Sequence, residues 1–205
     1  MNKIKEMEKL KIWNGKASEE QVREIAMRLK SGEIVIIPTD TMYAITGDAL
    51  NMKAVERICR LKNINPDKTN LSIICPDISV AAEYARIDNR AFALMKRVCP
   101  GPFTFLLRSA STLPRAFKGR KTVGIRIPDY AFARELALSL GNPLITTSIA
   151  YEEEDYAVNA DLIAETYCNK VDIMVDGGDG STGVSTIIDC TSGDPEIVRQ
   201  GEGTL

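Results

Sequence analysis

Apolar and polar residues follow one another along the chain in the two spacings that distinguish helices from strands. Apolar residues recur at helical spacing between Ser18, which stands in the setting of a capping box, and Gly32, so a helix is predicted there. Residues 34–37 then form an unbroken apolar run, which is typical of a strand covered on both faces. The chain therefore opens with a helix that leads into a buried strand.

This alternation continues to the end of the chain. Further helices are expected around 55–62, from Asp77 or Ser79, from Asp88 to 98, from Asp129 to 141, and around 161–167. Further strands are expected over 70–75, 104–107, 123–127, 144–147, 171–175, 185–188 and 196–198. Elements that alternate in this way indicate an α/β fold, and 205 residues suit a single domain over residues 1–205.

The composition is that of an ordinary soluble protein. Hydrophobic residues make up 44% of the chain and charged residues 26%, and no apolar run is long enough to span a bilayer. The N-terminus has charges every few residues and lacks the apolar segment of a secretory signal. We therefore expect a cytoplasmic protein that does not bind membranes.

The chain contains no histidine, which removes the usual general base and the usual metal ligand at neutral pH. Triad hydrolases and metalloenzymes with histidine ligands are thereby excluded. The five cysteines are odd in number and widely spaced, so we expect free, mostly buried thiols without a disulfide framework or zinc site. The net charge of −2 hides a division, because residues 1–126 hold 23 of the 26 basic residues and only 13 of the 28 acids.

The stretch "EIVIIPTDTMYAI", residues 33–45, has more hydrogen-bonding groups than a turn requires. The apolar run stops at a proline and opens into Thr39, Asp40, Thr41 and Tyr43. Either these side chains contact a ligand, or Thr39 and Thr41 satisfy backbone groups of their own loop.

Other polar residues stand at the ends of predicted strands and helices, where open α/β sheets bind ligands. Arg126 in "GIRIP" is the least ordinary, because a charge between two isoleucines needs a counter-charge or an opening onto a cleft. Lys62 has a simpler alternative role, which is to complement the dipole of the helix it ends. No P-loop and no dinucleotide-binding glycine pattern is present. The candidates are Lys62, Thr122, Arg126, Ser148, Ser185, Thr186 and Arg199.

Seven segments between residues 33 and 201 resemble the threonylcarbamoyl-AMP synthase family, also called YrdC/YciO-like. They are "IPTDTMYAI", "LKNINPD", "CPGPFTFLL", "TVGIRIPD", "LITTSIA", "VSTIIDC" and "IVRQG". The resemblance implies a twisted open mixed sheet flanked by helices, with a concave electropositive groove, and leaves residues 1–17 as an N-terminal extension. It also implies a reaction in which L-threonine, bicarbonate and ATP give threonylcarbamoyl-AMP and pyrophosphate, for modification of a tRNA adenosine.

The resemblance also implies roles for individual residues. Thr39, Thr41, Tyr43, Arg126 and Ser185 match threonine-binding positions, with Arg126 pairing with the substrate carboxylate. Lys62, Thr122, Ser148 and Arg199 match positions that bind ATP, and Lys62 and Arg126 are the expected catalytic residues. ATP is expected as a substrate that carries its own magnesium, without a transition metal bound to the protein.

Three positions depart from the family pattern and place the chain with the YciO branch. Ile64 stands where the Lys-x-Arg element has its arginine, Ala150 replaces the asparagine of Ser-Ala-Asn, and Ile74 or Cys75 replaces a histidine. Lost charged hydrogen bonds of about 1.5–3 kcal/mol each predict weak or altered activity on ATP or on threonylcarbamoyl-AMP. Lys68 and Arg60 are the nearest cations that could compensate.

A second interpretation is an RNA-binding protein on the same scaffold, without synthase activity. The segment 108–128 holds six basic residues and no acid, so it could follow the phosphates of double-stranded RNA or tRNA, or simply be a solvated loop.

Overall fold

A large mixed β-sheet organises the protein. The computed structural model describes residues 6–64, 71–112, 119–150 and 153–205 of the 205-residue chain, and all statements below concern these residues. Their strands are β1 (Glu8–Lys11), β2 (Val35–Ile37), β3 (Ala44–Asp48), β4 (Ser72–Ile74), β5 (Ala85–Arg86), β6 (Phe103–Ser109), β7 (Thr122–Arg126), β8 (Leu144–Ser148), β9 (Ile173–Asp176), β10 (Thr186–Asp189) and β11 (Glu196–Arg199).

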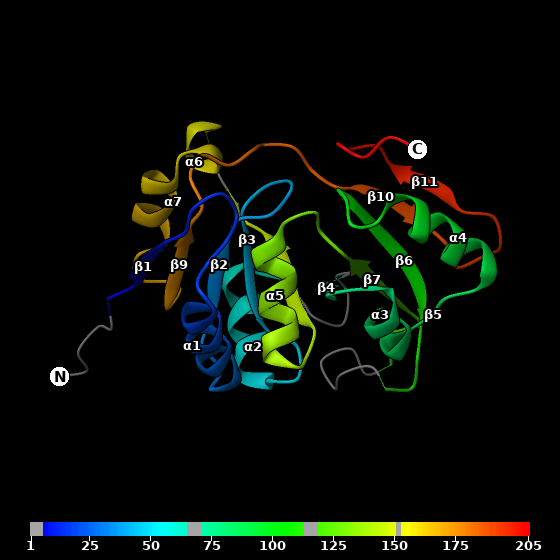
Figure 1. Ribbon diagram of the computed structural model, residues 1–205, viewed down its shortest axis with the longest axis horizontal. Helices are drawn as coiled ribbons and strands as arrows, with labels where there is room; N and C mark the ends of the chain where they lie inside the picture. Colours follow the sequence, from blue (N-terminus) through cyan, green and yellow to red (C-terminus); the bar gives the residue numbers. More distant parts are fainter. Residues whose placement is uncertain (1–5, 65–70, 113–118, 151–152) are drawn as a thin grey trace.

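Helices cover this sheet (Figure 1). They are α1 (Glu19–Lys30), α2 (Met52–Leu61), α3 (Ile78–Tyr84), α4 (Asn89–Val98), α5 (Ala131–Leu140), α6 (Asp155–Val158) and α7 (Ala160–Tyr167). The strand order is β1-β9-β2-β3-β8-β4-β7-β6-β10-β11, and β5 pairs with β6. Parallel pairs such as β4/β7 occur beside antiparallel pairs such as β6/β7, so the expected mixed α/β sheet is confirmed.

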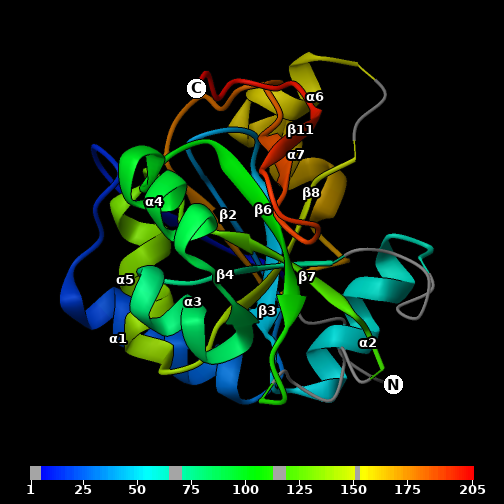
Figure 2. The ribbon, with the colours of Figure 1, turned by 90° about the vertical axis from the view of Figure 1, so that its right-hand side faces the viewer.

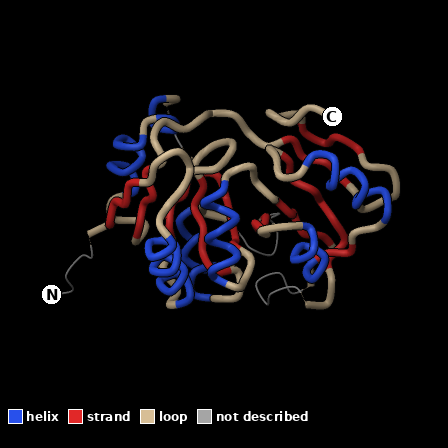
Figure 3. The backbone as a smooth tube through the Cα atoms, viewed as in Figure 1, coloured by secondary structure: helices blue, strands red, loops and turns tan. Residues whose placement is uncertain are grey.

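The sheet is strongly twisted. Seen from the side in Figure 2, its strands run in clearly different directions, and the tube in Figure 3 shows helices on both sides of the central strands. Alternate residues of β2 enter two different hydrophobic clusters: Ile34 and Ile36 one, Val35 and Ile37 the other. The prediction that residues 34–37 form a strand covered on both faces is thus confirmed.

Local capping signals fix the helix ends as the sequence predicts in most cases. Ser18 accepts a hydrogen bond from the Gln21 amide while the Gln21 side chain accepts one from the Ser18 amide, which completes the capping box of α1. Asp77 and Asp88 cap α3 and α4 in the same way, each accepting a bond from an amide three residues on.

The prediction that Asp129 caps α5 was wrong. Tyr130 is the N-cap residue of α5, and it makes no side-chain capping bond. The Asp129 carboxylate does not cap the helix and lies 3.6 Å from the Arg134 guanidinium. At the other end, Gly141 adopts the left-handed conformation (φ 73°) that closes the helix, as the sequence predicted.

The sequence missed four elements. These are β1, β3, β5 and α6. β1 has mostly charged residues, and its pairing with β9 rather than its own pattern makes it a strand. The five cysteines are free, and no helix within the described residues is long and apolar enough to cross a membrane.

Substitution of Ser18 by alanine tests the capping box. The change removes the acceptor for the Gln21 amide and should lower the free energy of unfolding by about 1 kcal/mol, as measured by urea denaturation. Glu24→Ala, at an exposed position in the same helix, is the control and should change stability by less than about 0.5 kcal/mol. Equal stability of the two variants would contradict the capping role.

Candidate functional site

The segment 38–43, which joins β2 to β3, is buried and fixed by its own hydroxyl groups. The Thr39 hydroxyl donates to the Met42 carbonyl at 2.8 Å and accepts from the Thr41 amide at 3.1 Å. The hydroxyls of Thr39 and Thr41 are themselves 3.1 Å apart. Part of the surplus hydrogen-bonding capacity therefore does satisfy the loop, while Asp40 and the Thr41 hydroxyl make its polar contact with the rest of the site.

That contact is with Arg126, at the end of β7. Its Nη2 donates to the Thr41 hydroxyl at 3.2 Å and to Asp40 Oδ1 at 2.6 Å. Asp40 Oδ2 in turn accepts from the Asp129 amide at 2.8 Å. The side chains of Arg126 and Asp40 are each 9% exposed, so this is a buried ion pair. It supplies the counter-charge that the position of Arg126 required.

Arg126 and the neighbouring Arg199 carry two positive charges, and Asp40 carries one negative charge. Burial lowers the pKa of Arg126, Asp40 opposes this effect, and the neighbouring Arg199 guanidinium lowers the pKa further. Arg126 Nε is buried and has no hydrogen-bond partner within the described residues. An unpaired buried donor costs about 1–3 kcal/mol, so the arrangement favours an acceptor from outside.

Arg199 belongs to a second group of residues, which includes Ser185. Arg199 Nη2 donates to the Ser185 carbonyl at 2.7 Å and to its hydroxyl at 3.2 Å. The Ser185 hydroxyl also lies 2.8 Å from that of Thr104. Thr104 precedes Phe105, which pairs with Ile125 of β7, so this group adjoins the end of β7 where Arg126 lies. Residues 41, 126, 185 and 199, distant in sequence, are thus brought together.

Tyr43 points away from this group. Its hydroxyl donates to the Gly178 carbonyl at 2.7 Å and accepts from the Gly177 amide at 3.0 Å. A Cβ at Gly180 would lie 2.7 Å from the Tyr43 ring, so a side chain there would collide with it. Burial raises the pKa of Tyr43 to about 12. The side chain anchors the segment that crosses from β9 to β10 (Figure 1), and its hydroxyl is already satisfied by backbone groups.

Lys62 and Ser148 form a third group. Lys62 is the C-cap residue of α2, and its Nζ donates to the Ser148 carbonyl at 2.8 Å rather than to the end of its own helix. Burial lowers the pKa of Lys62. Ser148 pairs with Ala44, and the Ile149 amide donates to the Tyr43 carbonyl, so this group adjoins the 38–43 segment from the other side.

A pocket of about 510 Å³ is lined by residues close in sequence to Lys62 and Ser148. Leu61 and Ala150 line it, together with Glu153, Tyr156, Thr166, Tyr167 and Lys170. Tyr167 holds Ala150 in place, because its hydroxyl accepts from the Ala150 amide at 2.9 Å and donates to the Ala150 carbonyl at 3.1 Å. Ile64 packs against the main hydrophobic cluster.

Thr122 is not in contact with the other candidates. It stands four residues before Arg126 on the same strand, about 13 Å away at about 3.3 Å per residue, and it lies opposite Arg108. Of the two cations considered as replacements for an arginine at position 64, Arg60 is exposed and Lys68 lies outside the described residues. So does the middle of the basic segment 108–128.

Sequence reasoning named Asp40 among the polar side chains that could contact a ligand but assigned it no partner, and it gave Thr104 no role. Asp40 had a signal, since it lies in the polar stretch after β2 and Arg126 demanded a counter-charge, but nothing in the sequence paired residues 86 positions apart. Thr104 had none, because a threonine in a strand is common. Both side chains contact residues that the sequence did select.

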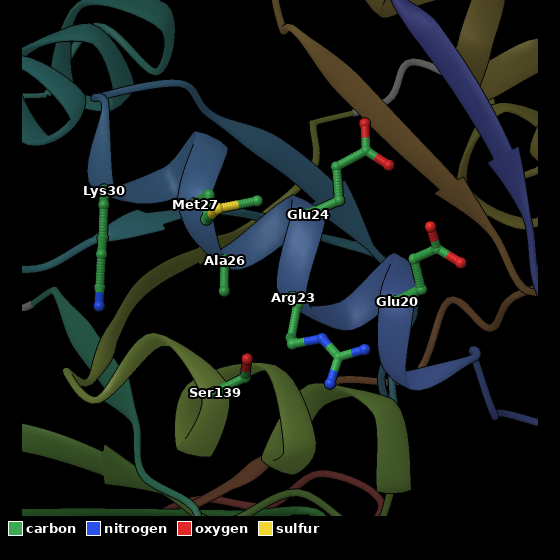
Figure 4. A pocket seen from close by; sticks show the side chains of 7 residues that line it. All are labelled: Glu20, Arg23, Glu24, Ala26, Met27, Lys30 and Ser139. Atoms are coloured by element: carbon green, nitrogen blue, oxygen red, sulfur yellow. The ribbon is translucent and has the colours of Figure 1, made fainter.

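Another pocket, of about 590 Å³, lies between α1 and α5 (Figure 4). Its lining consists largely of α1 side chains with ends in solvent, such as Glu20, Arg23 and Lys30, with Ser139 from α5. None of the residues selected from the sequence lines it. The candidate site is therefore the set of strand ends around Arg126 and Lys62.

Comparison with known proteins agrees with the resemblance seen in the sequence. The family model Sua5_yciO_yrdC, described as telomere recombination, matches residues 27–201. The uncharacterized protein YciO of Escherichia coli K12 is 34% identical over 180 residues, which covers 86% of this chain and 87% of YciO. The crystal structure of E. coli YciO superimposes with a TM-score of 0.88 at 30% identity and covers 97% of each chain.

Named synthases are also similar. The threonylcarbamoyl-AMP synthase of Pyrococcus abyssi is 30% identical over 183 residues, which covers 88% of this chain but only 54% of that protein. The crystal structure of P. abyssi Sua5 complexed with L-threonine has a TM-score of 0.84 at 28% identity, and it covers 94% of this chain and 57% of that one.

Replacement of Tyr43 by phenylalanine tests the anchoring of the segment after β9. It leaves the Gly177 amide without its partner, so the free energy of unfolding should fall by about 1–3 kcal/mol in urea denaturation. Tyr84→Phe, at a half-buried tyrosine on α3, is the matched control. A loss in the control as large as in Tyr43→Phe would refute the anchoring.

Proposed function

Because this chain belongs to the Sua5/YciO/YrdC family, we propose that it is an enzyme of the threonylcarbamoyl-AMP synthase type. It joins L-threonine, bicarbonate and ATP to form threonylcarbamoyl-AMP and pyrophosphate, and it does so weakly. The observation that carries this proposal is the buried guanidinium of Arg126, which has an unpaired Nε and a threonine hydroxyl beside it.

The group around Arg126 binds threonine in this proposal. A guanidinium pairs well with a carboxylate, and the excess of one positive charge over Asp40 matches a single carboxylate. The Thr41 and Ser185 hydroxyls flank Arg126 and Arg199 and offer hydrogen bonds to the polar groups of the substrate. Support comes from the similar P. abyssi protein, whose crystal structure contains L-threonine.

The nucleotide lies towards Lys62. Its ammonium group contacts only a backbone carbonyl within the described residues, so it is available to a phosphate. The Ser148 hydroxyl, on a side chain open to solvent, and the pocket lined by Ala150 and Leu61 are close by. Arg199, which the family resemblance matches to a nucleotide position, is held at Ser185 on the Arg126 side of the sheet, and magnesium arrives with the nucleotide.

The chemistry needs no histidine. The threonine nitrogen reacts with bicarbonate to give a carbamate and water, and a carbamate oxygen then attacks the α-phosphorus of ATP as pyrophosphate leaves. The protein contributes position and positive charge, which hold the carboxylate at Arg126 and the phosphates at Lys62. The nucleotide end is the weaker one, because the apolar Ile64 packs against the hydrophobic core and Ala150 has no side-chain amide to offer.

The RNA-binding alternative is not favoured. The similar proteins with a named activity are synthases, and the groups that the structure brings together are buried hydroxyls and guanidiniums suited to a small ligand. RNA affinity that falls steeply with salt and is indifferent to threonine would reverse this preference.

Two substitutions test the threonine end and the nucleotide end of the site separately. Arg126→Ala should abolish threonine binding, and Lys62→Ala should weaken ATP at least tenfold while threonine still binds, both measured by isothermal titration calorimetry. Pyrophosphate release that requires threonine and bicarbonate should disappear in Arg126→Ala.

Arg97→Ala and Lys96→Ala are the matched controls, since both residues are exposed on α4. They should leave binding and pyrophosphate release unchanged. If titration of threonine and ATP into the unaltered protein released or absorbed no heat, the proposed function would be contradicted.

A side-chain amide at position 150, where the family pattern has asparagine, should strengthen ATP binding. Ala150 is exposed beside the Lys62 pocket, so Ala150→Asn fits without repacking and should raise ATP affinity about tenfold through a hydrogen bond to a charged phosphate. Ala150→Leu has a similar size without the amide and should give no gain. A gain in both variants would attribute the effect to packing.

A further inference from the structure

We propose that Asp40 is a specificity-determining residue of the threonine end, whose carboxylate selects ligands with an α-ammonium group next to the carboxylate held by Arg126. The inference rests on the proposed function and extends it, because it assigns recognition of the substrate nitrogen to a residue that the family motif did not indicate. It follows from the way in which Asp40 is fixed.

Asp40 is held at both oxygens. Oδ1 accepts from Arg126 Nη2 at 2.6 Å, and Oδ2 accepts from the Asp129 amide at 2.8 Å. A carboxylate has about four acceptor positions, so each oxygen can still accept a further bond. The side chain is 9% exposed, as is that of Arg126. Asp40 therefore presents negative charge at one place and in one orientation.

Arg126 is left with a donor to offer. Asp40 and Thr41 both occupy Nη2, while Nε is buried without a partner. Because Asp40 binds one nitrogen of the guanidinium, a ligand carboxylate has to bind a different nitrogen of the same group. The ligand carboxylate and Asp40 then share the same guanidinium, which sets the two negative groups side by side.

Arg126 and Arg199 together balance Asp40 and one ligand carboxylate, but Arg199 is held at Ser185 and not at Asp40. A ligand ammonium group would lie beside Asp40, because in an α-amino acid the nitrogen is attached to the carbon that carries the carboxylate. An acid without the amine would bring its negative charge next to Asp40 with no ammonium group beside it.

A purely structural role for Asp40 is the alternative, since it also ties the 38–43 segment to β7 and to the start of the α5 region. Such a role predicts that removal of the charge weakens all ligands alike. Recognition of the ammonium group predicts a change in the ratio between ligands, and the ratio is what the experiment measures.

The probes are L-threonine, 3-hydroxybutanoate, which lacks the amine, and threoninol, which lacks the carboxylate, each titrated by calorimetry into the full-length protein. The unaltered protein should bind threonine at least tenfold tighter than 3-hydroxybutanoate. In Asp40→Asn, threonine affinity should fall about tenfold while that for 3-hydroxybutanoate stays or rises, which brings the two within about threefold. Asp40→Glu keeps the charge and should restore part of the discrimination.

Equal loss of both ligands in Asp40→Asn, or similar affinities for both in the unaltered protein, would overturn the inference while threonine binding stands. The comparison of threonine with 3-hydroxybutanoate in the unaltered protein needs no variant, so it can overturn the inference even if Asp40→Asn does not fold. Threoninol is the internal control for Arg126 and should bind far more weakly than threonine. Failure of threonine to bind the unaltered protein would instead count against the proposed function.

Discussion

The buried ion pair between Arg126 and Asp40 constrains the whole site. A guanidinium that is 9% exposed needs a fixed counter-charge, and Asp40 provides it from a segment that lies far away in sequence. Because Asp40 also accepts from the Asp129 amide, one carboxylate joins the β2–β3 connection, the end of β7 and the approach to α5. The position of Thr39 and Thr41 follows from this anchorage.

The twist of the sheet makes that anchorage geometrically feasible. β8 and β4 separate β3 from β7 in the strand order, so a flat sheet would keep the β2–β3 connection away from Arg126. In the twisted sheet the connection reaches across to β7. The segment that runs from β9 to β10 brings Ser185 to the same side, and β11 brings Arg199 against it. The hydroxyls and cations converge because of the architecture, not because of any one motif.

The two ends of the site differ in how completely they are built. Around Arg126, each side chain has partners, with one buried donor left over for a ligand. Around Lys62, the ammonium group bonds to a backbone carbonyl, Ile64 packs against the core, and Ala150 is held through its backbone by Tyr167. The Arg126 end therefore holds more fixed polar side chains than the Lys62 end.

The sequence by itself determined the elements whose cause is local. The capping box at Ser18, the cap at Asp88 and the apolar run at 34–37 act through neighbouring residues and were predicted correctly, and the cap at Asp77 was one of two expected starts of α3. The seven family segments also identified the mixed α/β sheet and most residues that gather around Arg126.

Only the tertiary structure decided the rest. β1 is a strand because β9 pairs with it, the Tyr43 hydroxyl is taken by a glycine segment 134 residues away, and Asp40 meets Arg126 across 86 residues. Pairings of this length depend on the order and twist of the strands, which local spacing does not encode. The sequence could therefore indicate that Arg126 needs a counter-charge, but only the folded chain identifies Asp40 as the residue that supplies it.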